Sequence, residues 1–265
     1  MPDALCPLLC ISGTGTDVGK SVVTAALLRA LRQKGLDAQA LKPVQTGCAA
    51  SPEGQPLSPD AALYKEACPQ ARALSLISLA PPCSPHLAAE TENRPIASGP
   101  LLEKIRAAAQ TAPFTLLEGA GGLLTPLSTN ECFIDLFAAL EAPLVLVGAN
   151  VLGTVNHVLL SLEALRARKV NILRVVLAAT MPPGEPGSLS ERIERDNPLI
   201  IAELGKVETP LCLPYARGLR NPDPDERDAA WAHLAACLAP LADQALAGRP
   251  PLAGSNDASL TPRDV

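Results

Sequence analysis

The chain has 265 residues, of which 48% are hydrophobic and 18% are charged. This composition excludes a wholly disordered chain, and the length allows one large or two small domains with a sizeable core. The 22 Lys and Arg residues against 27 Asp and Glu residues give a net charge of −5, and only 2% of residues are aromatic. Without a basic surface or base-stacking aromatic side chains, no nucleic-acid partner is expected.

The remaining composition points to the cytoplasm. Eight cysteines are dispersed without a CxxC pair, which favours free thiols over disulfides or a zinc site. The N-terminus contains Asp3 and no positive region, so no signal peptide is predicted. Residues 142–162 carry no charge, but Pro143, Gly148 and Asn156 fit a strand, a loop and a helix better than a bilayer span. We therefore expect a cytoplasmic protein with no membrane partner.

Short β-rich runs alternate with helical stretches along the chain. The predicted strands are Leu8–Ser12, Ala38–Lys42, Phe114–Leu117, Leu144–Gly148, Ile172–Ala178 and Pro210–Leu213. Apolar residues recurring every three or four positions predict helices over Ser21–Lys34, Leu101–Gln110, Val155–Arg168, Leu189–Leu204 and Asp225–Leu246. This alternation predicts an α/β fold, with a mostly parallel β-sheet and helices on both faces.

Three stretches depart from the alternation. Pro43–Pro59 and Ala80–Pro100 are rich in Pro, Ser and Gly and are predicted to be long loops, functional or locally mobile. Residues 247–265 lose all periodicity and are predicted to form a disordered tail. Since no second-domain boundary is evident, residues 1–246 are predicted to form a single domain.

A glycine-rich loop lies between the first predicted strand and the first predicted helix. Its sequence, GTGTDVGKS at residues 13–21, is typical of a phosphate-binding P-loop, although five residues instead of the usual four separate Gly13 from Gly19. Glycines let backbone N–H groups point inward, Lys20 can contact the outer phosphates, and the Ser21 hydroxyl can reach Mg²⁺. The loop predicts a P-loop NTPase-like fold and nucleoside triphosphate binding through Gly13, Thr14, Gly15, Thr16, Asp17, Val18, Gly19, Lys20 and Ser21.

Three further charged residues are candidates for the same crevice. Lys42 and Glu118 end predicted strands, and the carboxyl ends of parallel strands share one edge of a sheet. Lys42 would suit an anionic acceptor, or it extends to the surface. Glu118 would contact a metal or substrate, or it is a solvated strand end. Asp60 is a possible metal ligand, but from local sequence alone it is better explained as a helix N-terminal residue.

These pieces together resemble the dethiobiotin synthetase family. The similarity runs from about Leu8 to Tyr215 through an ordered series of motifs: GTGTDVGKS, KPVQTG, SPDAA, PPCSPH, EGAGGLLTPLS, LVLVGANVLGTVNHVLL, TMPPGEPG, IERDNPLIIAELG and LPY. The phosphate loop is shared with many proteins, whereas EGAGG followed by TPLS and LGTVNH is far more specific.

The resemblance implies an ATP- and Mg²⁺-dependent ligase of biotin biosynthesis. Its reaction converts 7,8-diaminopelargonic acid and CO₂ to dethiobiotin, through a carbamate and a carbamic-phosphoric mixed anhydride. By the match of motifs, the catalytic residues would be Lys20 on the phosphates, Lys42 on the carbamate and Thr16 on the reacting groups. Thr46 would also bind the reacting groups, and Mg²⁺ would be held by Ser21, Asp60 and Glu118, the last of which also lies at the nucleotide.

The family likeness further implies a homodimer with substrate at the subunit boundary. Gly121 would pack on the substrate, whose carboxylate would meet a helix N-terminus of the partner chain formed by Gly153, Thr154, Val155 and Asn156. Pro214 and Tyr215 would wall the base, or form a structural turn. Base preference is undecided, because some members carry an Asn where this chain has Ala178-Ala179-Thr180.

Two other classes deserve comparison. Positioning or partitioning P-loop ATPases share this broad fold and are the alternative function, but their signature lysine is replaced by Gly15 and no lysine precedes Lys20. ATP-dependent amidases acting on cobyrinic acids carry a glutamine-hydrolysing domain, for which this chain has no room.

Overall fold

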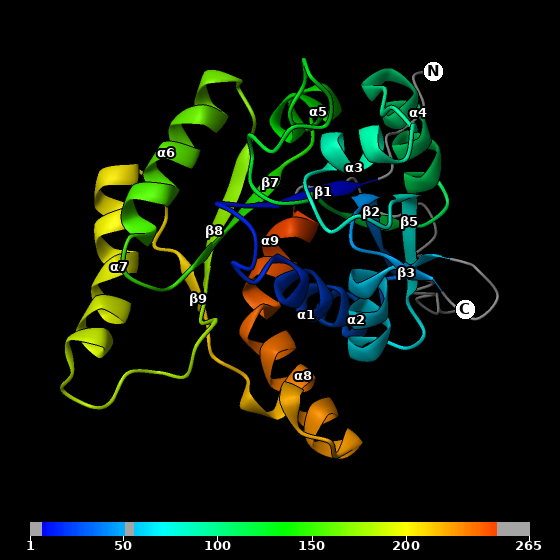
Figure 1. The fold of residues 1–265 in the computed structure, drawn as a ribbon. Helices are drawn as coiled ribbons and strands as arrows, with labels where there is room; N and C mark the ends of the chain where they lie inside the picture. The colour runs from blue at the N-terminus through cyan, green and yellow to red at the C-terminus, as the bar shows by residue number, and fades with distance from the viewer. Residues whose placement is uncertain (1–6, 51–55, 248–265) are drawn as a thin grey trace, which may run out of the picture.

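A seven-stranded sheet forms the centre of the molecule in the computed structural model, which describes residues 7–50 and 56–247 (Figure 1). The strand order is β5-β2-β6-β1-β7-β8-β9, and every pair is parallel. The strands are β1 (Leu8–Gly13), β2 (Ala38–Gln45), β5 (Arg72–Ser78), β6 (Phe114–Glu118), β7 (Leu144–Ala149), β8 (Ile172–Ala178) and β9 (Leu211–Leu213). A separate antiparallel pair joins β3 (Ala49–Ala50) to β4 (Pro56–Leu57). The predicted parallel α/β fold is confirmed.

Helices cover both faces of the sheet. One face carries α1 (Lys20–Gln33), α2 (Pro59–Ala67), α8 (Pro224–Cys237) and α9 (Ala239–Ala247). The other carries α3 (Pro85–Thr91), α4 (Ser98–Ala109), α5 (Phe133–Leu140), α6 (Thr154–Ala167) and α7 (Leu189–Gly205). A short 3₁₀ helix, η1 (Arg217–Arg220), precedes α8. Within the described ranges, no helix is long and apolar enough to cross a membrane.

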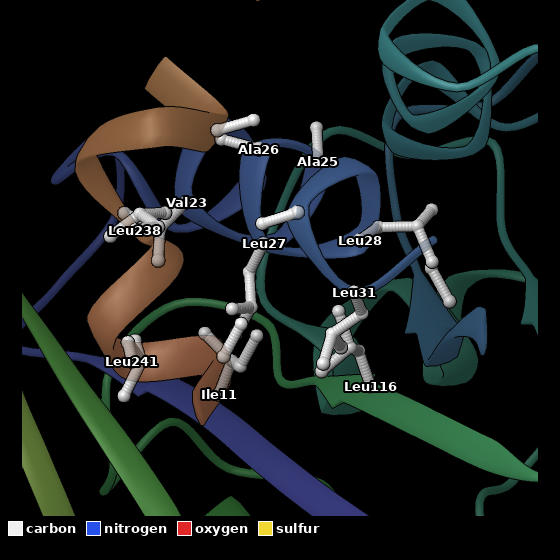
Figure 2. Packing of buried hydrophobic residues seen from close by; sticks show 14 of the residues in the cluster. Ile11, Val23, Ala25, Ala26, Leu27, Leu28, Leu31, Leu116, Leu238 and Leu241 are labelled. Carbon is white, nitrogen blue, oxygen red and sulfur yellow. The ribbon is translucent and has the colours of Figure 1, made fainter. Parts of the chain in front are cut away.

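Side-chain alternation along the strands divides the core in two. In β1, Leu9 and Ile11 face the α1 side while Cys10 between them faces the α5 side, and the other central strands alternate in the same way. Figure 2 shows Leu27 of α1 pointing toward Ile11, with Leu241 of α9 beside them. Both faces of the central strands are therefore buried, which is why β1 and β7 appear in the sequence as nearly continuous apolar runs.

The structure corrects several predicted boundaries. The predicted helix Asp225–Leu246 is two helices that are separated at Leu238. Pro240 has no N–H group with which to continue the helical hydrogen bonds. The predicted loop Pro43–Pro59 begins as the end of β2 and contains β3 and β4, and Ala80–Pro100 contains α3. The predicted tail begins one residue too early, since α9 includes Ala247, and its other residues lie outside the described part of the chain.

Several elements were not predicted. β3, β4, η1 and α3 are too short to leave a pattern, and α2 was anticipated only as a helix start at Asp60. α5 has only eight residues, although its buried Phe133, Leu136, Phe137 and Leu140 follow a helical spacing. The edge strand β5 mixes Ser with Leu and pairs only with β2, so tertiary packing rather than local pattern decides it.

The α1 core supports a stability prediction. Leu27 is completely buried against the sheet, so Leu27→Ala leaves a cavity and should lower the free energy of unfolding by about 2–5 kcal/mol. Urea denaturation checks this, with Leu87→Ala on the exposed side of α3 as a control expected within about 0.5 kcal/mol of the parent. An equal loss in both variants would contradict the assignment of Leu27 to the core.

Candidate active site

The glycine-rich loop joins β1 to α1 as predicted. Gly13 ends β1, and a side chain there would lie 2.7 Å from the Val18 methyl group. Gly19 caps α1 with a φ of 97°, and a Cβ on it would lie 2.7 Å from Ala178. Both positions therefore require glycine. The first N–H groups of α1 have no partners within the helix and, together with the helix dipole, make this end of the sheet attractive to anions.

Lys20 is held against the loop that it follows. Its Nζ donates a hydrogen bond to the Gly15 carbonyl oxygen at 2.6 Å, and its side chain is nearly buried. Burial, helped by the positive charge of Lys42, lowers the pKa of Lys20 to about 8, although the carboxylates of Glu118 and Asp60 act in the opposite direction. The ammonium is thus poorly solvated, which favours a phosphate partner.

A four-residue polar cluster lies beside the loop. The Lys42 Nζ is 2.7 Å from Glu118 Oε1 and 2.7 Å from Asp60 Oδ2, while the Ser21 Oγ lies 2.7 Å from Asp60 Oδ1 and 2.9 Å from Glu118 Oε1. These side chains come from β2, β6, α2 and α1. The structure therefore brings together four residues that are up to 97 positions apart in sequence.

The burial of these side chains decides whether Lys42, Glu118 and Asp60 lie at the site or in the alternative positions that the sequence allows. Lys42 is 3% exposed and Glu118 is 0% exposed, so neither the surface lysine nor the solvated strand-end carboxylate is correct. Asp60 fits both of its alternatives. It lies in the first turn of α2, whose N-cap is Ser58, and its carboxylate also reaches the cluster. A short helix dipole therefore assists in presenting the carboxylate.

Charge pairing balances the burial of these groups. Burial by itself would lower the pKa of Lys42, but Glu118 and Asp60 outweigh it and raise that pKa. Burial would raise the pKa of Asp60, but the charge and hydrogen bond of Lys42, with the Ser21 hydroxyl, lower it. The Lys42 ammonium and the Asp60 carboxylate therefore both stay charged at neutral pH.

Tyr64 is a site residue that the sequence analysis missed. It is completely buried, and its hydroxyl donates to Glu118 Oε2 at 2.6 Å. Burial, followed by the charge of Glu118, raises the pKa of Tyr64 well above its ordinary value, so the phenol remains a donor. The available signal was its spacing of four residues from Asp60, which places both on one side of α2.

The glycine turn after β6 packs directly on the phosphate loop. A Cβ on Gly122 would lie 3.3 Å from the Thr14 carbonyl oxygen, and one on Gly119 would lie 2.7 Å from the Phe137 ring. Gly121 has a φ of 63°, and the Thr125 hydroxyl accepts a hydrogen bond from the Gly122 amide at 2.8 Å. Backbone, not side chains, thus forms this wall of the site.

These groups line a cavity of about 630 Å³. Its lining residues include Thr16, Asp17, Gly19, Lys20, Ser21, Lys42, Thr46, Asp60, Glu118 and Gly121. Residues after β8 and β9 also line it, including Thr180, Pro214, Tyr215 and Arg220. Gly13, Thr14, Gly15 and Val18 belong to the same loop without lining the cavity. Its volume and its lining of both charged and apolar residues suit a nucleotide and a second reactant.

Arg220 was also missed. It lies in a run of alternating charges at residues 217–228, where the 3₁₀ helix η1 places the exposed Arg220 at the cavity, with its guanidinium carbon 5.9 Å from the centre of the Tyr215 ring. An alternation of charges in sequence does not reveal which of the charged residues lies beside a cavity.

The predicted carboxylate-binding segment lies elsewhere. Gly153, Thr154, Val155 and Asn156 form the start of α6, and none of these described residues lines the cavity. Gly153 has a φ of 92° with open space around its α-carbon, and Leu152 before it is 82% exposed. Within one chain, the structure does not bring this segment to the other site residues.

The donors present fit a hard cation. Ser21, Asp60 and Glu118 offer one hydroxyl and two carboxylates, the oxygen ligands that Mg²⁺ prefers. Over residues 7–50 and 56–247, no group of three or more His, Cys, Asp or Glu side chains could hold a metal ion by itself. Phosphate and water oxygens would have to complete the coordination, as is usual for Mg²⁺ beside a nucleotide.

Comparison with known proteins defines the family. Residues 8–223 match a family model described as an AAA domain. An ATP-dependent dethiobiotin synthetase of Anaeromyxobacter sp. (strain Fw109-5) is 41% identical over 67% of this chain and 79% of its own length, and one of Anaeromyxobacter sp. (strain K) is 39% identical over 78% and 89%. The chain belongs to the dethiobiotin synthetase family.

Solved structures outside the dethiobiotin synthetases share the fold. The cell division ATPase MinD of Pyrococcus furiosus is 16% identical, with a TM-score of 0.54 over 89% of this chain and 99% of its own. The MinC:MinD complex of Aquifex aeolicus gives a TM-score of 0.56 at 12% identity, over 93% of this chain and 98% of the matched one. At such identities the likeness confirms the P-loop NTPase-like fold alone.

The position of Lys20 generates a binding prediction. Lys20→Ala should weaken binding of a non-hydrolysable ATP analogue by at least about tenfold, because a charge-assisted hydrogen bond to phosphate is lost. Calorimetric titration in EDTA measures this without metal. Lys104→Ala, an exposed lysine of α4, is the matched control and should bind like the parent. Equal affinities for both variants would remove Lys20 from the nucleotide site.

Proposed function

We propose that this chain converts 7,8-diaminopelargonic acid, CO₂ and ATP to dethiobiotin, ADP and phosphate with Mg²⁺. Family membership supports this reaction. The observation that supports the assignment of residues is the Lys42 ammonium, which lies 2.7 Å from two carboxylates beside a phosphate loop. ATP dependence is common to the matched relatives. A cavity with a phosphate loop at one wall and a second lysine at another fits a reaction between a nucleotide and an anion.

The chemistry needs three bond-forming steps. An amine nitrogen of the diamine attacks CO₂ and loses a proton, giving a carbamate. A carbamate oxygen then attacks the γ-phosphorus of ATP, and the bond to ADP breaks. The second amine attacks the carbonyl carbon of this mixed anhydride and loses a proton, phosphate leaves, and the cyclic urea closes. Negative charge accumulates throughout, so cations and positioning carry the catalysis.

The position of each residue in the fold suggests which reacting group it would contact. Lys20, from the first turn of α1, would neutralise the phosphates and the transferred phosphoryl group, and Lys42, from β2, would stabilise the carbamate and the mixed anhydride. The Thr16 and Thr46 side chains, both at the cavity, would orient the reacting groups. Gly121 would pack on the substrate chain, and Pro214 and Tyr215 would wall the base.

Mg²⁺ would be held by Ser21, Asp60 and Glu118. The bound ion would draw charge from the phosphate oxygens and orient the nucleotide. Ser21 and Asp60 sit at the starts of α1 and α2, and Glu118 ends β6, so backbone geometry fixes the origin of each ligand. The assignment of these three ligands is supported by the carboxylate oxygens of Asp60 and Glu118, which both lie within 3 Å of the Ser21 hydroxyl.

The second proposed feature is a homodimer that completes the substrate site. The N-terminus of α6, Gly153 to Asn156, would receive the carboxylate of the substrate bound in the partner chain, through N–H groups of its first turn and the helix dipole. Large exposed apolar side chains on this side of the molecule support an interface: Leu152, Leu160 and Leu199 are 59–82% exposed. We also propose a single ligase domain over residues 1–246.

The proposed compartment is the cytoplasm. Seven cysteines in the described ranges are free, including the buried Cys10 and the exposed Cys212, which fits a reducing environment. No nucleic acid partner is proposed, because the net charge is −5.

The deciding assay follows phosphate release with Mg²⁺ and ATP, with and without diamine and bicarbonate, and identifies the product by mass. Phosphate and dethiobiotin are expected in equal amounts and only when all components are present. ATP turnover that ignores the diamine and responds instead to DNA, lipid or a partner protein would favour a positioning or partitioning ATPase.

Lys42 offers a sharper mutational prediction. Lys42→Ala should lower the turnover number at least about 100-fold, because a cation aimed at the developing charge is removed. The affinity for the ATP analogue in EDTA should change only a few-fold, since Lys20 is intact. Lys65→Ala, on the exposed side of α2, is the control. Unchanged turnover in Lys42→Ala would exclude the residue from the mechanism.

Mixing two inactive variants tests the shared site. Lys42→Ala damages one component of a site, and Asn156→Asp, which places a carboxylate where the substrate carboxylate would bind, is expected to damage the component that the partner supplies. A mixed dimer of the two keeps one intact site, so random exchange should restore about a quarter of parental activity. No recovery after exchange, verified by mass measurement of the mixed dimer, would refute a substrate site built from two chains.

A further inference from the structure

The two oxygens of Glu118 have different partners. Oε1 meets the Lys42 Nζ at 2.7 Å and the Ser21 Oγ at 2.9 Å, on the side of the cavity. Oε2 accepts the hydroxyl proton of Tyr64 at 2.6 Å. Glu118 is completely buried, so water does not compete for either oxygen. One carboxylate oxygen therefore faces the cavity-lining Lys42 and Ser21, whereas the other is held by Tyr64, which does not line the cavity.

Tyr64 is fixed in this role. Its ring belongs to the buried cluster between α1 and the sheet, and it has no exposed surface. It stands on α2, which also carries Asp60 and packs on α1, the helix of Ser21. A ring locked by close packing cannot swing its hydroxyl away at low cost. The helix that supplies one proposed metal ligand thus also restrains another.

This restraint distinguishes between two cations. Mg²⁺ requires nearly ideal octahedral geometry at 2.0–2.1 Å, whereas Ca²⁺ takes six to eight oxygens and commonly uses both oxygens of a carboxylate. We propose that Tyr64 is a positioning residue that confines Glu118 to one-oxygen ligation, and thereby makes the nucleotide site select Mg²⁺ over Ca²⁺. This inference rests on the proposed function of Glu118 as a metal ligand.

The test compares Tyr64→Phe with the parent chain. This substitution keeps the ring and removes only the hydroxyl. The full chain with saturating ADP is titrated with Mn²⁺ by electron paramagnetic resonance, and Mg²⁺ or Ca²⁺ is then used to displace Mn²⁺. Because ADP is common to all samples, a change in the ratio of Mg²⁺ to Ca²⁺ affinity reports the protein. The ratio should fall at least about tenfold in Tyr64→Phe, the scale typical of losing an outer-shell partner.

Thr115→Val is the matched control. Thr115 lies on the same strand as Glu118, is equally buried, and its hydroxyl accepts a hydrogen bond from Gln39 Nε2 at 2.9 Å. Losing that hydroxyl should cost stability while leaving the Mg²⁺ to Ca²⁺ ratio at the parental value. A similar fall of the ratio in Thr115→Val would mean that general loosening is responsible, and would overturn the inference.

Glu118→Gln separates this inference from the proposed function. It should weaken binding of both cations. If it does so while Tyr64→Phe keeps the parental ratio, the metal site stands and the role of Tyr64 is wrong. If Glu118→Gln leaves both affinities unchanged, Glu118 is not a ligand and both proposals fail.

A measurement that keeps the Tyr64 hydroxyl guards against a Tyr64→Phe variant that does not fold. The chain contains two tyrosines, so incorporation of 3-fluorotyrosine gives two ¹⁹F resonances, and Tyr215→Phe identifies that of Tyr64. With ADP bound, Ca²⁺ should shift the Tyr64 resonance more than Mg²⁺, because only Ca²⁺ draws on the second oxygen of Glu118. Equal shifts from both cations would overturn the inference.

Discussion

The pairing of Lys42 with Asp60 and Glu118 is the interaction on which the site depends. Burying one of these charges alone would be costly, and removing one partner of such a group typically destabilises a protein by about 3–5 kcal/mol. Together, with Ser21 and Tyr64, they satisfy one another within 2.6–2.9 Å. The same arrangement that makes burial tolerable also collects, at one point, a cation, two carboxylates and a hydroxyl next to a phosphate loop.

Much of the fold was predictable because the sheet is buried on both sides. Strands such as Leu144–Ala149 carry apolar residues on both faces, so they stand out as apolar runs between amphipathic helices, and the predicted and observed bounds of β8 agree. Where an element owes its shape to neighbours, the pattern is weak. The edge strand β5 and the short α3 have too few residues in the core to leave a period in the sequence.

The site residues that could be predicted from the sequence are those whose positions the backbone of the fold determines. Lys20 and Ser21 follow from the glycine spacing, and Lys42 and Glu118 follow from the rule that parallel strands end at a common edge. Asp60 was predicted as a metal ligand only through the resemblance, since its local sequence is better explained by a helix start. Tyr64 and Arg220 were missed because the hydrogen bond of a buried hydroxyl and the placement of an exposed guanidinium beside the cavity depend on how α2 and η1 pack, which no local pattern encodes.

The adjacency of β2, β6 and β1 has a consequence for robustness. Lys42, Glu118 and the phosphate loop stand on three neighbouring strands, joined by peptide hydrogen bonds at the regular spacing of about 4.8 Å. The distances between these reactive groups are thus set by the main chain of the sheet. Core side chains on either face can drift in size and shape over evolutionary time while the separation of the reactive groups stays constant.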